Sequence, residues 1–266
     1  MALGRAGMPE LERVAAGLQQ RTRGARWARA ARLRLRDVIR SQPPTWEATR
    51  DDLAFRYLKG EGIEIGALYR PQRVPPAAHV RFVDHADFEG LQRIYPSHDW
   101  VQAPHVVDEA ETLATFEDES LDFVIANHVL EHVEDPVAAL GAFLRVLRPG
   151  GIVFLTLPDP RHSFDGRRAR TTVEHVLRDH REGPETSRRE HYEEWAHIVE
   201  GLPDERAIEQ RVEEFAREGT RNHFHVWELK TFLELLFALD LPVTIEATQV
   251  TEPEFAVVLR KATPTA

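Results

Sequence analysis

The stretch at residues 121–158, LDFVIANHVLEHVEDPVAALGAFLRVLRPGGIVFLTLP, constrains the fold of this chain more than any other. It contains two apolar runs, at residues 123–126 and 152–157, of the kind that buried parallel strands need. A helix signal lies between them. Asp135 suits the N-cap and Pro136 the first helical position, and apolar residues then recur at helical spacing until a Pro-Gly-Gly turn. Strand, helix and strand predict a right-handed crossover in a parallel sheet, where ligands bind at the carboxyl ends of the strands.

The composition limits the classes of protein to which the chain can belong. With 266 residues and 42% hydrophobic residues, it is long enough for one large α/β domain with an addition. The absence of cysteine excludes disulfides and cysteine-metal sites. No apolar run approaches the roughly 18 residues of a membrane span, and the first residues lack the apolar core of a signal peptide. We therefore expect a soluble, cytoplasmic protein without a transmembrane segment.

Charge is unevenly distributed along the chain. The net charge of −10 argues against nucleic acid as a partner. Arginines nevertheless crowd residues 21–40. They fit either an exposed helix that acidic surface balances elsewhere, or a contact with an anionic partner such as a phosphate-bearing substrate or a membrane surface.

The pattern of apolar and polar segments predicts four parts. Residues 1–58 form an N-terminal helical segment, and residues 59–158 form an α/β core. Residues 159–225 are charged, poor in aliphatic side chains and rich in histidine, which favours a helical cap over a site at the strand ends. Residues 226–266 combine an amphipathic helix with two runs that predict a terminal β-hairpin.

Short motifs recur at the ends of the predicted core strands. They are Glu-x-Gly at 64–66, Asp84, Val-Asp at 107–108, DFVIAN at 122–127, Leu-Glu-His at 130–132 and RVLRPGG at 145–151. This set resembles that of class I S-adenosylmethionine-dependent methyltransferases. The resemblance implies a doubly wound, mostly parallel, seven-stranded Rossmann-like sheet with N-terminal helices and a helical insertion after the fifth strand. It also implies S-adenosylmethionine as the cofactor and methyl transfer as the reaction.

The resemblance assigns the cofactor site to the strand ends. The expected cofactor-binding residues are Glu64, Gly66, Ala67, Asp84, Asp108, Asn127 and His128. Asp84 can accept hydrogen bonds from both ribose hydroxyls, and Gly66 lets the backbone approach the ligand. Glu64 can hold the charged amino acid end, directly or through water. By resemblance, Asp108 lies near the adenine amino group, and the backbone at residues 127–128 flanks the amino acid moiety.

The glycine-rich turn departs from the family pattern. The family usually has two or three glycines that run into a helix, whereas this chain has EIGALYRP at residues 64–71, followed by further prolines. We therefore expect the amino acid end of the cofactor to be held differently, with Tyr69 and Arg70 as candidate contributors.

The residues that follow the fourth strand suggest a metal site. On a helix, His128, Glu131 and His132 would share a face. They fit the H-x-x-E-H pattern of inverted zinc peptidases, but the strand before them matches the methyltransferase context instead. They are similar to the plant small-RNA 2′-O-methyltransferase, whose Glu-x-x-Glu-His motif and a distant histidine bind a divalent ion. Glu131 and His132 are either metal ligands or structural residues. The distant ligand would come from His162, His223 or His225.

Methyl transfer from a sulfonium requires alignment of the acceptor and, for a hydroxyl, a base. Asp159 and His162 follow the fifth strand and are, with His132, the candidate catalytic residues. The histidine-rich cap and the metal-diol hypothesis favour O-methylation of a sugar, a glycan-like molecule or another polar small molecule. Two other classes stay open. One is a nicotinamide-dependent oxidoreductase, since Asp84 would serve a dinucleotide ribose, although G-x-G-x-x-G is missing. The other is a noncatalytic binding module with the methyltransferase fold.

Overall fold

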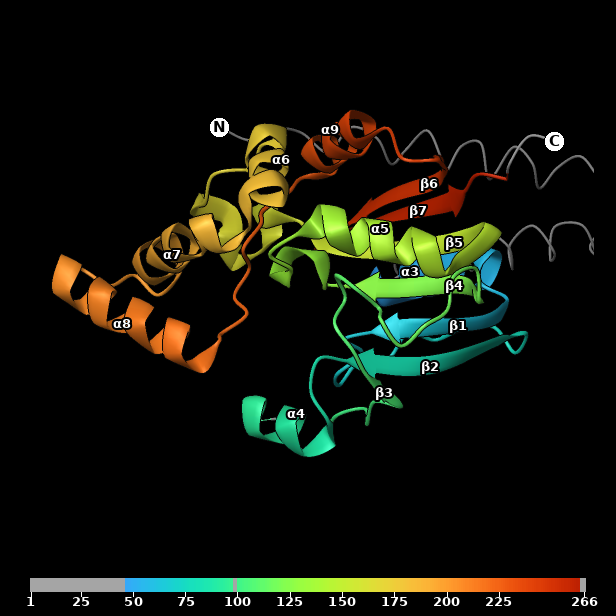
Figure 1. The fold of residues 1–266 in the computed structure, drawn as a ribbon, viewed down its shortest axis with the longest axis horizontal. Helices are drawn as coiled ribbons and strands as arrows, with labels where there is room; N and C mark the ends of the chain where they lie inside the picture. The colour runs from blue at the N-terminus through green and yellow to red at the C-terminus, as the bar shows by residue number, and fades with distance from the viewer. Residues whose placement is uncertain (1–45, 98–99, 264–266) are drawn as a thin grey trace, which may run out of the picture. The chain divides into compact units, whose positions relative to one another are not determined.

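The structure is a computed structural model that describes residues 46–97 and 100–263 (Figure 1). The arginine-rich stretch at residues 21–40 lies outside the described residues, and so does most of the predicted N-terminal helical segment. Its last part is described as helix α3 (Trp46–Tyr57). No helix in the described ranges is long and apolar enough to span a bilayer.

The described residues contain one seven-stranded sheet with the strand order β3-β2-β1-β4-β5-β7-β6. The strands are β1 (Gly60–Ile65), β2 (Ala78–Asp84), β3 (Val106–Val107), β4 (Leu121–Asn127), β5 (Leu147–Pro158), β6 (Val243–Thr251) and β7 (Glu254–Lys261). Strands β1 to β5 run parallel, while β7 is antiparallel to both β5 and β6. The strand order reverses between β1 and β4, where open α/β sheets bind their ligands. The predicted doubly wound, seven-stranded sheet is confirmed.

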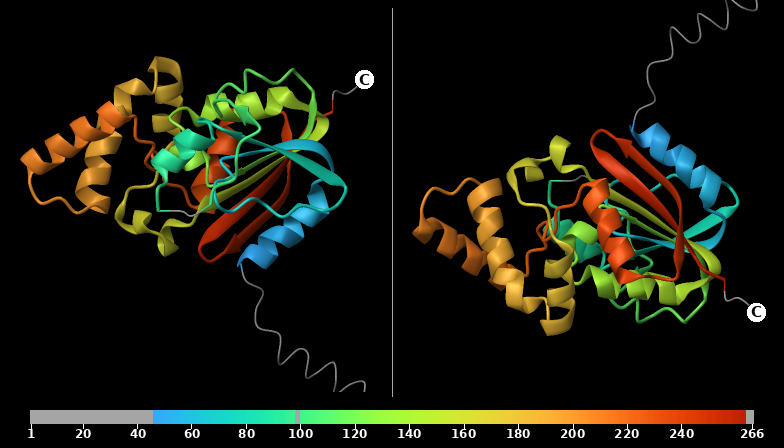
Figure 2. Two further views of the ribbon diagram at one scale, coloured as in Figure 1. Left: turned by 90° about the horizontal axis from the view of Figure 1, so that it is seen from below. Right: turned by 90° about the horizontal axis from the view of Figure 1, so that it is seen from above.

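Alternation of side chains along the central strands buries both faces of the sheet. Helices α5 (Pro136–Val146) and α9 (Leu229–Leu239) cover one face of the sheet, as Figure 2 shows. Val124 packs in the core on that face. Phe123 and Ile125 point to the other face and pack against α3. Such apolar burial on both sides is what the continuous apolar run of β4 predicts.

Helix α5 begins as the sequence predicts and ends earlier. The Asp135 side chain accepts a hydrogen bond from the backbone N–H of Ala138, and Pro136 occupies the first turn. The helix stops at Val146, and Leu147 already pairs with Leu121 of β4. Strand β5 therefore contains the Pro-Gly-Gly turn that was expected to separate it from the helix.

A helical insertion lies between β5 and α9 (Figure 1). It comprises two 3₁₀ turns (Pro160–His162 and Phe164–Arg167), α6 (Val173–Glu182), α7 (Glu185–Glu194), a π-helical turn (Trp195–Val199) and α8 (Glu205–Glu218). The insertion has a small apolar core of its own, in which Tyr192, Val212 and Phe215 are buried. Helices α7 and α8 thus bury their apolar stripes against one another, whereas Val176 of α6 joins the main core.

An extended connection at residues 219–228, here called the strap, returns the chain from α8 to the core (Figure 1). The backbone N–H groups of Phe224 and His225 donate to the carbonyl oxygen of Glu131, at 2.7 and 3.2 Å. These bonds attach the strap to the turn that follows β4. Residues from the insertion and from the core are thereby brought to the same end of the sheet.

Candidate functional site

Two cavities open at the carboxyl ends of the central strands. The small cavity has a volume of about 90 Å³, and the large cavity about 660 Å³. Both are lined by Gly66, Leu68, Tyr95, His128 and His132. Among the residues predicted from the sequence, the small cavity adds Asp84 and Asp108, and the large cavity adds Glu64, Ala67, Asn127 and His162. The structure therefore brings most of the predicted site residues together.

Glu64, near the end of β1, is a buried carboxyl beside the large cavity. Both of its oxygens accept a hydrogen bond from the backbone N–H of Gln72, at 2.9 and 3.0 Å. Burial raises the pKa of Glu64 to about 7, even though the Gln72 hydrogen bond and the nearby Arg50 act in the opposite direction. Gly66 then adopts a φ of 64°, a left-handed conformation that glycine accepts without strain. A cationic group placed against Glu64 would favour its charged form.

The two acids at the ends of β2 and β3 differ in how their carboxylates are used. Asp84 is buried, and its Oδ1 accepts a hydrogen bond from the backbone N–H of His85 at 2.8 Å. Asp108 accepts from four donors, the backbone N–H groups of Glu109, Ala114 and Thr115 and the Thr115 hydroxyl. Burial alone would raise the pKa of Asp108, but these hydrogen bonds lower it. Four donors fill the acceptor sites of a carboxylate, which argues against the predicted adenine contact of this side chain.

His128 does not occupy the position expected of a metal ligand. Its φ of 53° ends the strand in a left-handed conformation, so the expected helical face does not form. Its Nε2 lies 2.8 Å from Glu254, and its Nδ1 lies 3.4 Å from Glu131. Burial by itself lowers the pKa of His128, but the two carboxylates outweigh it and raise the pKa to about 9. A protonated imidazole between two carboxylates has no lone pair for a metal, which corrects the prediction for this residue.

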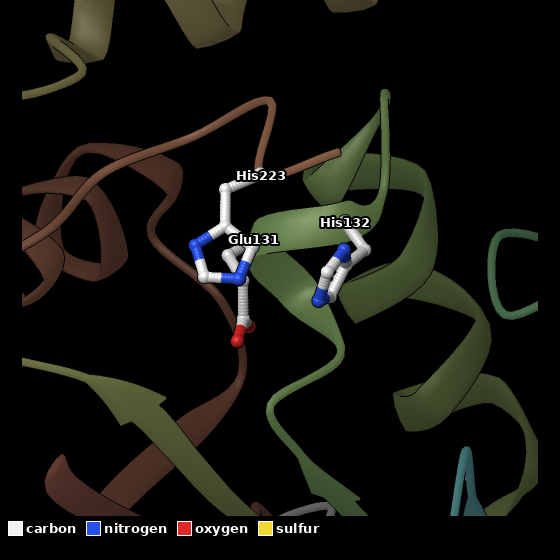
Figure 3. Close-up of side chains that lie close together, drawn as sticks. All are labelled: Glu131, His132 and His223. Atoms are coloured by element: carbon white, nitrogen blue, oxygen red, sulfur yellow. The ribbon is translucent and has the colours of Figure 1, made fainter. Parts of the chain in front are cut away.

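Glu131, His132 and His223 instead form a compact group, here called the core trio (Figure 3). One ligand atom from each lies within 4.8 Å of the others. Glu131 and His132 come from the 3₁₀ turn after β4, and His223 comes from the strap. The sequence offered His223 only as one of three distant candidates. The trio forms because the strap is bonded to the backbone of Glu131.

Hydrogen bonds fix the tautomers of both histidines in the core trio. The Nδ1 of His132 lies 2.8 Å from the carbonyl oxygen of Arg221, and the Nδ1 of His223 lies 2.7 Å from Asp165. Since both partners are acceptors, each Nδ1 carries a hydrogen, and in the neutral imidazole the lone pair is then on Nε2. Burial lowers the pKa of His132, which keeps its imidazole neutral. A histidine that binds a metal through one nitrogen commonly donates its other N–H to an acceptor in this way.

The carboxylate of Glu131 completes the donor set. Glu131 is 1% exposed, and among the described residues its oxygens have no hydrogen bond of good geometry, only a long contact of 3.4 Å with the Nδ1 of His128. Burial alone would raise the pKa of Glu131. The lowering effect of His128 and the two trio histidines is larger, so the carboxyl is ionised. The protonated His128 compensates part of this buried charge, and the other side of the carboxylate can accept a further cation. Two imidazoles and one carboxylate suit a divalent transition ion and leave coordination positions open.

The predicted catalytic acid Asp159 is a structural residue. It is 2% exposed and does not line the large cavity. Its carboxylate accepts three hydrogen bonds from the Arg161 guanidinium, at 2.9, 3.1 and 2.5 Å, which lower its pKa. Asp159 is thus a poor base. His162 does line the cavity, with its Nδ1 3.3 Å from Glu252.

A second group of similar composition lies inside the insertion, here called the insertion cluster: His175, Asp179 and His191. The Nε2 of His175 lies 3.1 Å from the Nε2 of His191 and 3.1 Å from Asp179. Burial lowers the pKa of His191 to about 4. His225, another of the three candidates for the distant ligand, lies near this cluster instead and stacks on Trp227 with ring centroids 4.9 Å apart.

Three functional-site residues escaped prediction because their partners are distant in sequence. Arg50 and Glu254 are 204 positions apart and form a buried ion pair of 3.3 Å beside His128. Asp165 lies two residues after Ser163, whose hydroxyl caps the 3₁₀ turn at Phe164–Arg167. That local pattern predicts a 3₁₀ turn and gives no sign that Asp165 supports His223.

Residues 94–155 match the family described as a methyltransferase domain, which confirms the predicted resemblance. The chain is 34% identical over 92 residues to a ubiquinone biosynthesis O-methyltransferase of Xanthomonas oryzae pv. oryzae (strain PXO99A), covering 34% of this chain and 38% of the relative. It is 36% identical over 66 residues to the protein of that name from Xanthomonas campestris pv. campestris (strain B100), covering 25% and 28%. The matches thus span well under half the length of these relatives. A SAM dependent methyltransferase from Aquifex aeolicus superposes with a TM-score of 0.44 at 10% identity, covering 81% of this chain and 89% of that chain.

Proposed function

We propose that this chain, as a class I methyltransferase, transfers the methyl group of S-adenosylmethionine to a hydroxyl of a polar small molecule. The observation that carries the proposal is the meeting of two cavities at the switch point of the sheet. Asp84 lines the small cavity, Glu64 lines the large cavity, and Gly66 lines both. An acid for a ribose diol and an acid for an ammonium group thus flank one glycine turn.

Glu64 is suited to the amino acid end of the cofactor. Its pKa of about 7 means that a large fraction of the carboxyl is protonated in the free protein near neutral pH. Binding of an ammonium group would favour the carboxylate and release a proton. Asn127 lies beside this acid, with its Nδ2 3.3 Å from the Gln72 side chain. Cofactor binding is therefore expected to weaken as pH falls below about 7, since protonated Glu64 cannot pair with the ammonium.

The reaction is an in-line displacement that the chain's own residues align. The acceptor oxygen forms a bond to the methyl carbon, the bond between that carbon and the sulfonium sulfur breaks, and the hydroxyl proton passes to a base. His162 lines the large cavity and is our candidate for that base. Exclusion of water and alignment of the acceptor supply much of the acceleration, and a base adds about 10²–10⁴-fold.

The core trio is the candidate acceptor-binding site. Glu131, His132 and His223 would hold a divalent ion, which would supply Lewis-acid polarisation of the acceptor oxygen. A pair of neighbouring hydroxyls, as on a sugar or a glycan-like molecule, matches open coordination positions of this kind. The relatives are named as O-methyltransferases, which agrees with an oxygen acceptor.

A thermal-shift titration with S-adenosylhomocysteine and, separately, NAD tests the cofactor. We expect S-adenosylhomocysteine to stabilise the protein and NAD to have no effect, because a ligand stabilises only the protein that binds it. Glu64→Gln should weaken binding by about 10-fold or more, because it removes a charge partner. Stabilisation by NAD alone would favour the oxidoreductase, and failure of calorimetry to detect S-adenosylhomocysteine would favour a noncatalytic module.

A further inference from the structure

The large cavity contains an exposed aromatic ring that the methyl-transfer chemistry does not require. Phe164 is 55% exposed and lines this cavity. Tyr69, which is 43% exposed, lines the same cavity. Leu68 and Pro158 add further apolar surface to the lining. The cavity therefore combines apolar surface with two members of the core trio, His132 and His223.

Phe164 is held in place by the residues on either side of it. The Ser163 hydroxyl accepts a hydrogen bond from the backbone N–H of Asp165 at 3.2 Å, which closes the 3₁₀ turn around the ring. Asp165 is buried, with Arg168 at 2.8 Å and His223 at 2.7 Å. A ring whose backbone is fixed on both sides loses little further freedom when it binds a ligand.

The Phe164 ring also lies directly against the core trio. Its centroid is 4.8 Å from that of His223 and 5.3 Å from that of Trp195, which meets it edge-on. These contacts fix the orientation of the ring and leave more than half of the residue exposed. Phe164 and His223 both line the large cavity, so a ligand there can contact both.

We propose that Phe164 is an acceptor-positioning residue that stacks on a flat ring carrying two adjacent hydroxyls, so that these hydroxyls face the core trio. This inference rests on the proposed methyl transfer. The recognition chemistry is a flat apolar ring face beside a vicinal diol. An aromatic diol and a pyranose sugar both present it, because a sugar ring has an apolar face formed by its C–H groups. Aromatic stacking strengthens such contacts beyond simple burial.

Steady-state kinetics with catechol and with methyl mannopyranoside test this proposal and separate the two sources. Phe164→Ala should raise the KM for the accepted ring diol by about 5–10-fold, with kcat changed by less than about threefold, because stacking contributes mainly to binding. Phe164→Tyr should restore a KM within about twofold of the wild type, and Phe164→Leu should be intermediate. The class of acceptor whose KM responds identifies the source of the ring.

Phe237→Ala is the matched control. Phe237 is 73% exposed on α9 and is not among the residues that line the two cavities. Its substitution should leave both KM values unchanged. Calorimetric titration of S-adenosylhomocysteine should give the wild-type affinity in all four variants, so a loss there would report damage to the cofactor site instead.

Equilibrium binding of the two diols, measured by calorimetry with S-adenosylhomocysteine present, makes the result independent of turnover. Binding of either diol that Phe164→Ala weakens and Phe164→Tyr restores supports the proposal. It is overturned if neither diol binds the wild-type protein, or if Phe164→Ala binds them as the wild type does. S-adenosylhomocysteine binding without diol binding would leave the methyltransferase proposal standing and reject the stacking role.

Discussion

The core trio and the insertion cluster are built from the same side chains, two histidines and one carboxylate, yet their surroundings differ. In the core trio, Arg221 and Asp165 each accept a hydrogen bond from a histidine Nδ1. In the insertion cluster, the Arg178 guanidinium donates to the Nδ1 of His175 at 2.9 Å. A donor at Nδ1 requires the hydrogen to sit on Nε2, so this nitrogen faces the cluster as a donor and not as a ligand.

The carboxylates of the two groups differ in the same way. Asp179 accepts a hydrogen bond from the Ser187 hydroxyl at 2.6 Å and lies 3.2 Å from Arg178. Among the described residues, Glu131 has only the long 3.4 Å contact with the Nδ1 of His128. In the insertion cluster, hydrogen-bond donors thus satisfy the histidine and carboxylate acceptors. In the core trio, the ligand atoms are acceptors that lie within 4.8 Å of one another with no hydrogen between them. The partners of a histidine-carboxylate group, rather than its composition, decide whether it can hold a cation.

Removal of one ligand of the core trio should cause the largest loss of metal affinity. His223→Ala should weaken Mn²⁺ or Zn²⁺ binding by at least about 100-fold, because loss of a ligand exceeds the loss caused by a supporting group. His191→Ala, the matched change in the insertion cluster, should alter the affinity by less than about twofold. Calorimetric or competition titration of each ion measures both. Equal losses in the two variants would contradict the distinction.

A change in the group that supports His223 should have the next largest effect. Asp165→Asn offers an amide that can donate to Nδ1, so the hydrogen can move to Nε2 and remove the lone pair. We expect metal affinity to fall by about 10–100-fold. Ser187→Ala removes the corresponding support of Asp179 and should leave metal affinity unchanged. If Asp165→Asn bound the ions as tightly as the wild type, tautomer control would be rejected.

The insertion cluster should be visible instead in the pH dependence of stability. The folded protein lowers the pKa of His191 to about 4 from its usual 6.5, so between these values the unfolded chain binds more protons. The contribution of neutral His191 to the free energy of unfolding is therefore complete above pH 6.5 and is lost as the pH falls toward 4. Urea unfolding should show wild type losing about 1–2 kcal/mol more than His191→Gln over this range. Parallel pH profiles for the two proteins would contradict the buried, neutral state of His191.

The smallest effect is expected on the thermal stability of the metal-free protein when the carboxylate of the core trio, Glu131, is replaced. Glu131→Gln removes a buried carboxylate that contacts His128 at 3.4 Å, but Glu254 still pairs with His128 at 2.8 Å and the desolvation cost of one charge is removed. The Tm of the metal-free protein should change by less than about 2 °C. Asp179→Asn should lower it by about 5 °C or more, because it disrupts a satisfied buried network. Scanning calorimetry on chelator-treated protein measures both Tm values. A larger loss of Tm in Glu131→Gln than in Asp179→Asn would contradict this expectation.

The fold could be predicted from the sequence because its signals are local. The apolar run of β4, the Asp135 cap and the apolar run of β5 specify a strand, a helix and a strand without reference to distant residues. The end of α5 was misplaced because pairing of Leu147 with Leu121 overrides the Pro-Gly-Gly signal. Tertiary contacts, which the local pattern does not contain, decided that boundary.

The candidate site was only partly predictable for the same reason. Glu64 and Asp84 lie at strand ends, which parallel-sheet geometry brings together. The pairing of His223 with Glu131 depends on the path of the strap, and the diversion of His128 depends on Glu254 in the last strand. A spacing of three and four residues predicts convergence only on a helix, and the left-handed backbone at His128 prevents one.

The most direct measurement is mass-spectrometric quantification of S-adenosylhomocysteine and methylated diol after incubation of the protein with S-adenosylmethionine, a divalent ion and a ring diol. Our account predicts equal amounts of the two products with the wild-type protein. It also predicts at least about a 100-fold lower rate with His223→Ala, because acceptor alignment is lost. A wild-type protein that binds S-adenosylmethionine yet forms neither product, or a His223→Ala variant of undiminished rate, would contradict the claim that the core trio presents the acceptor to the cofactor.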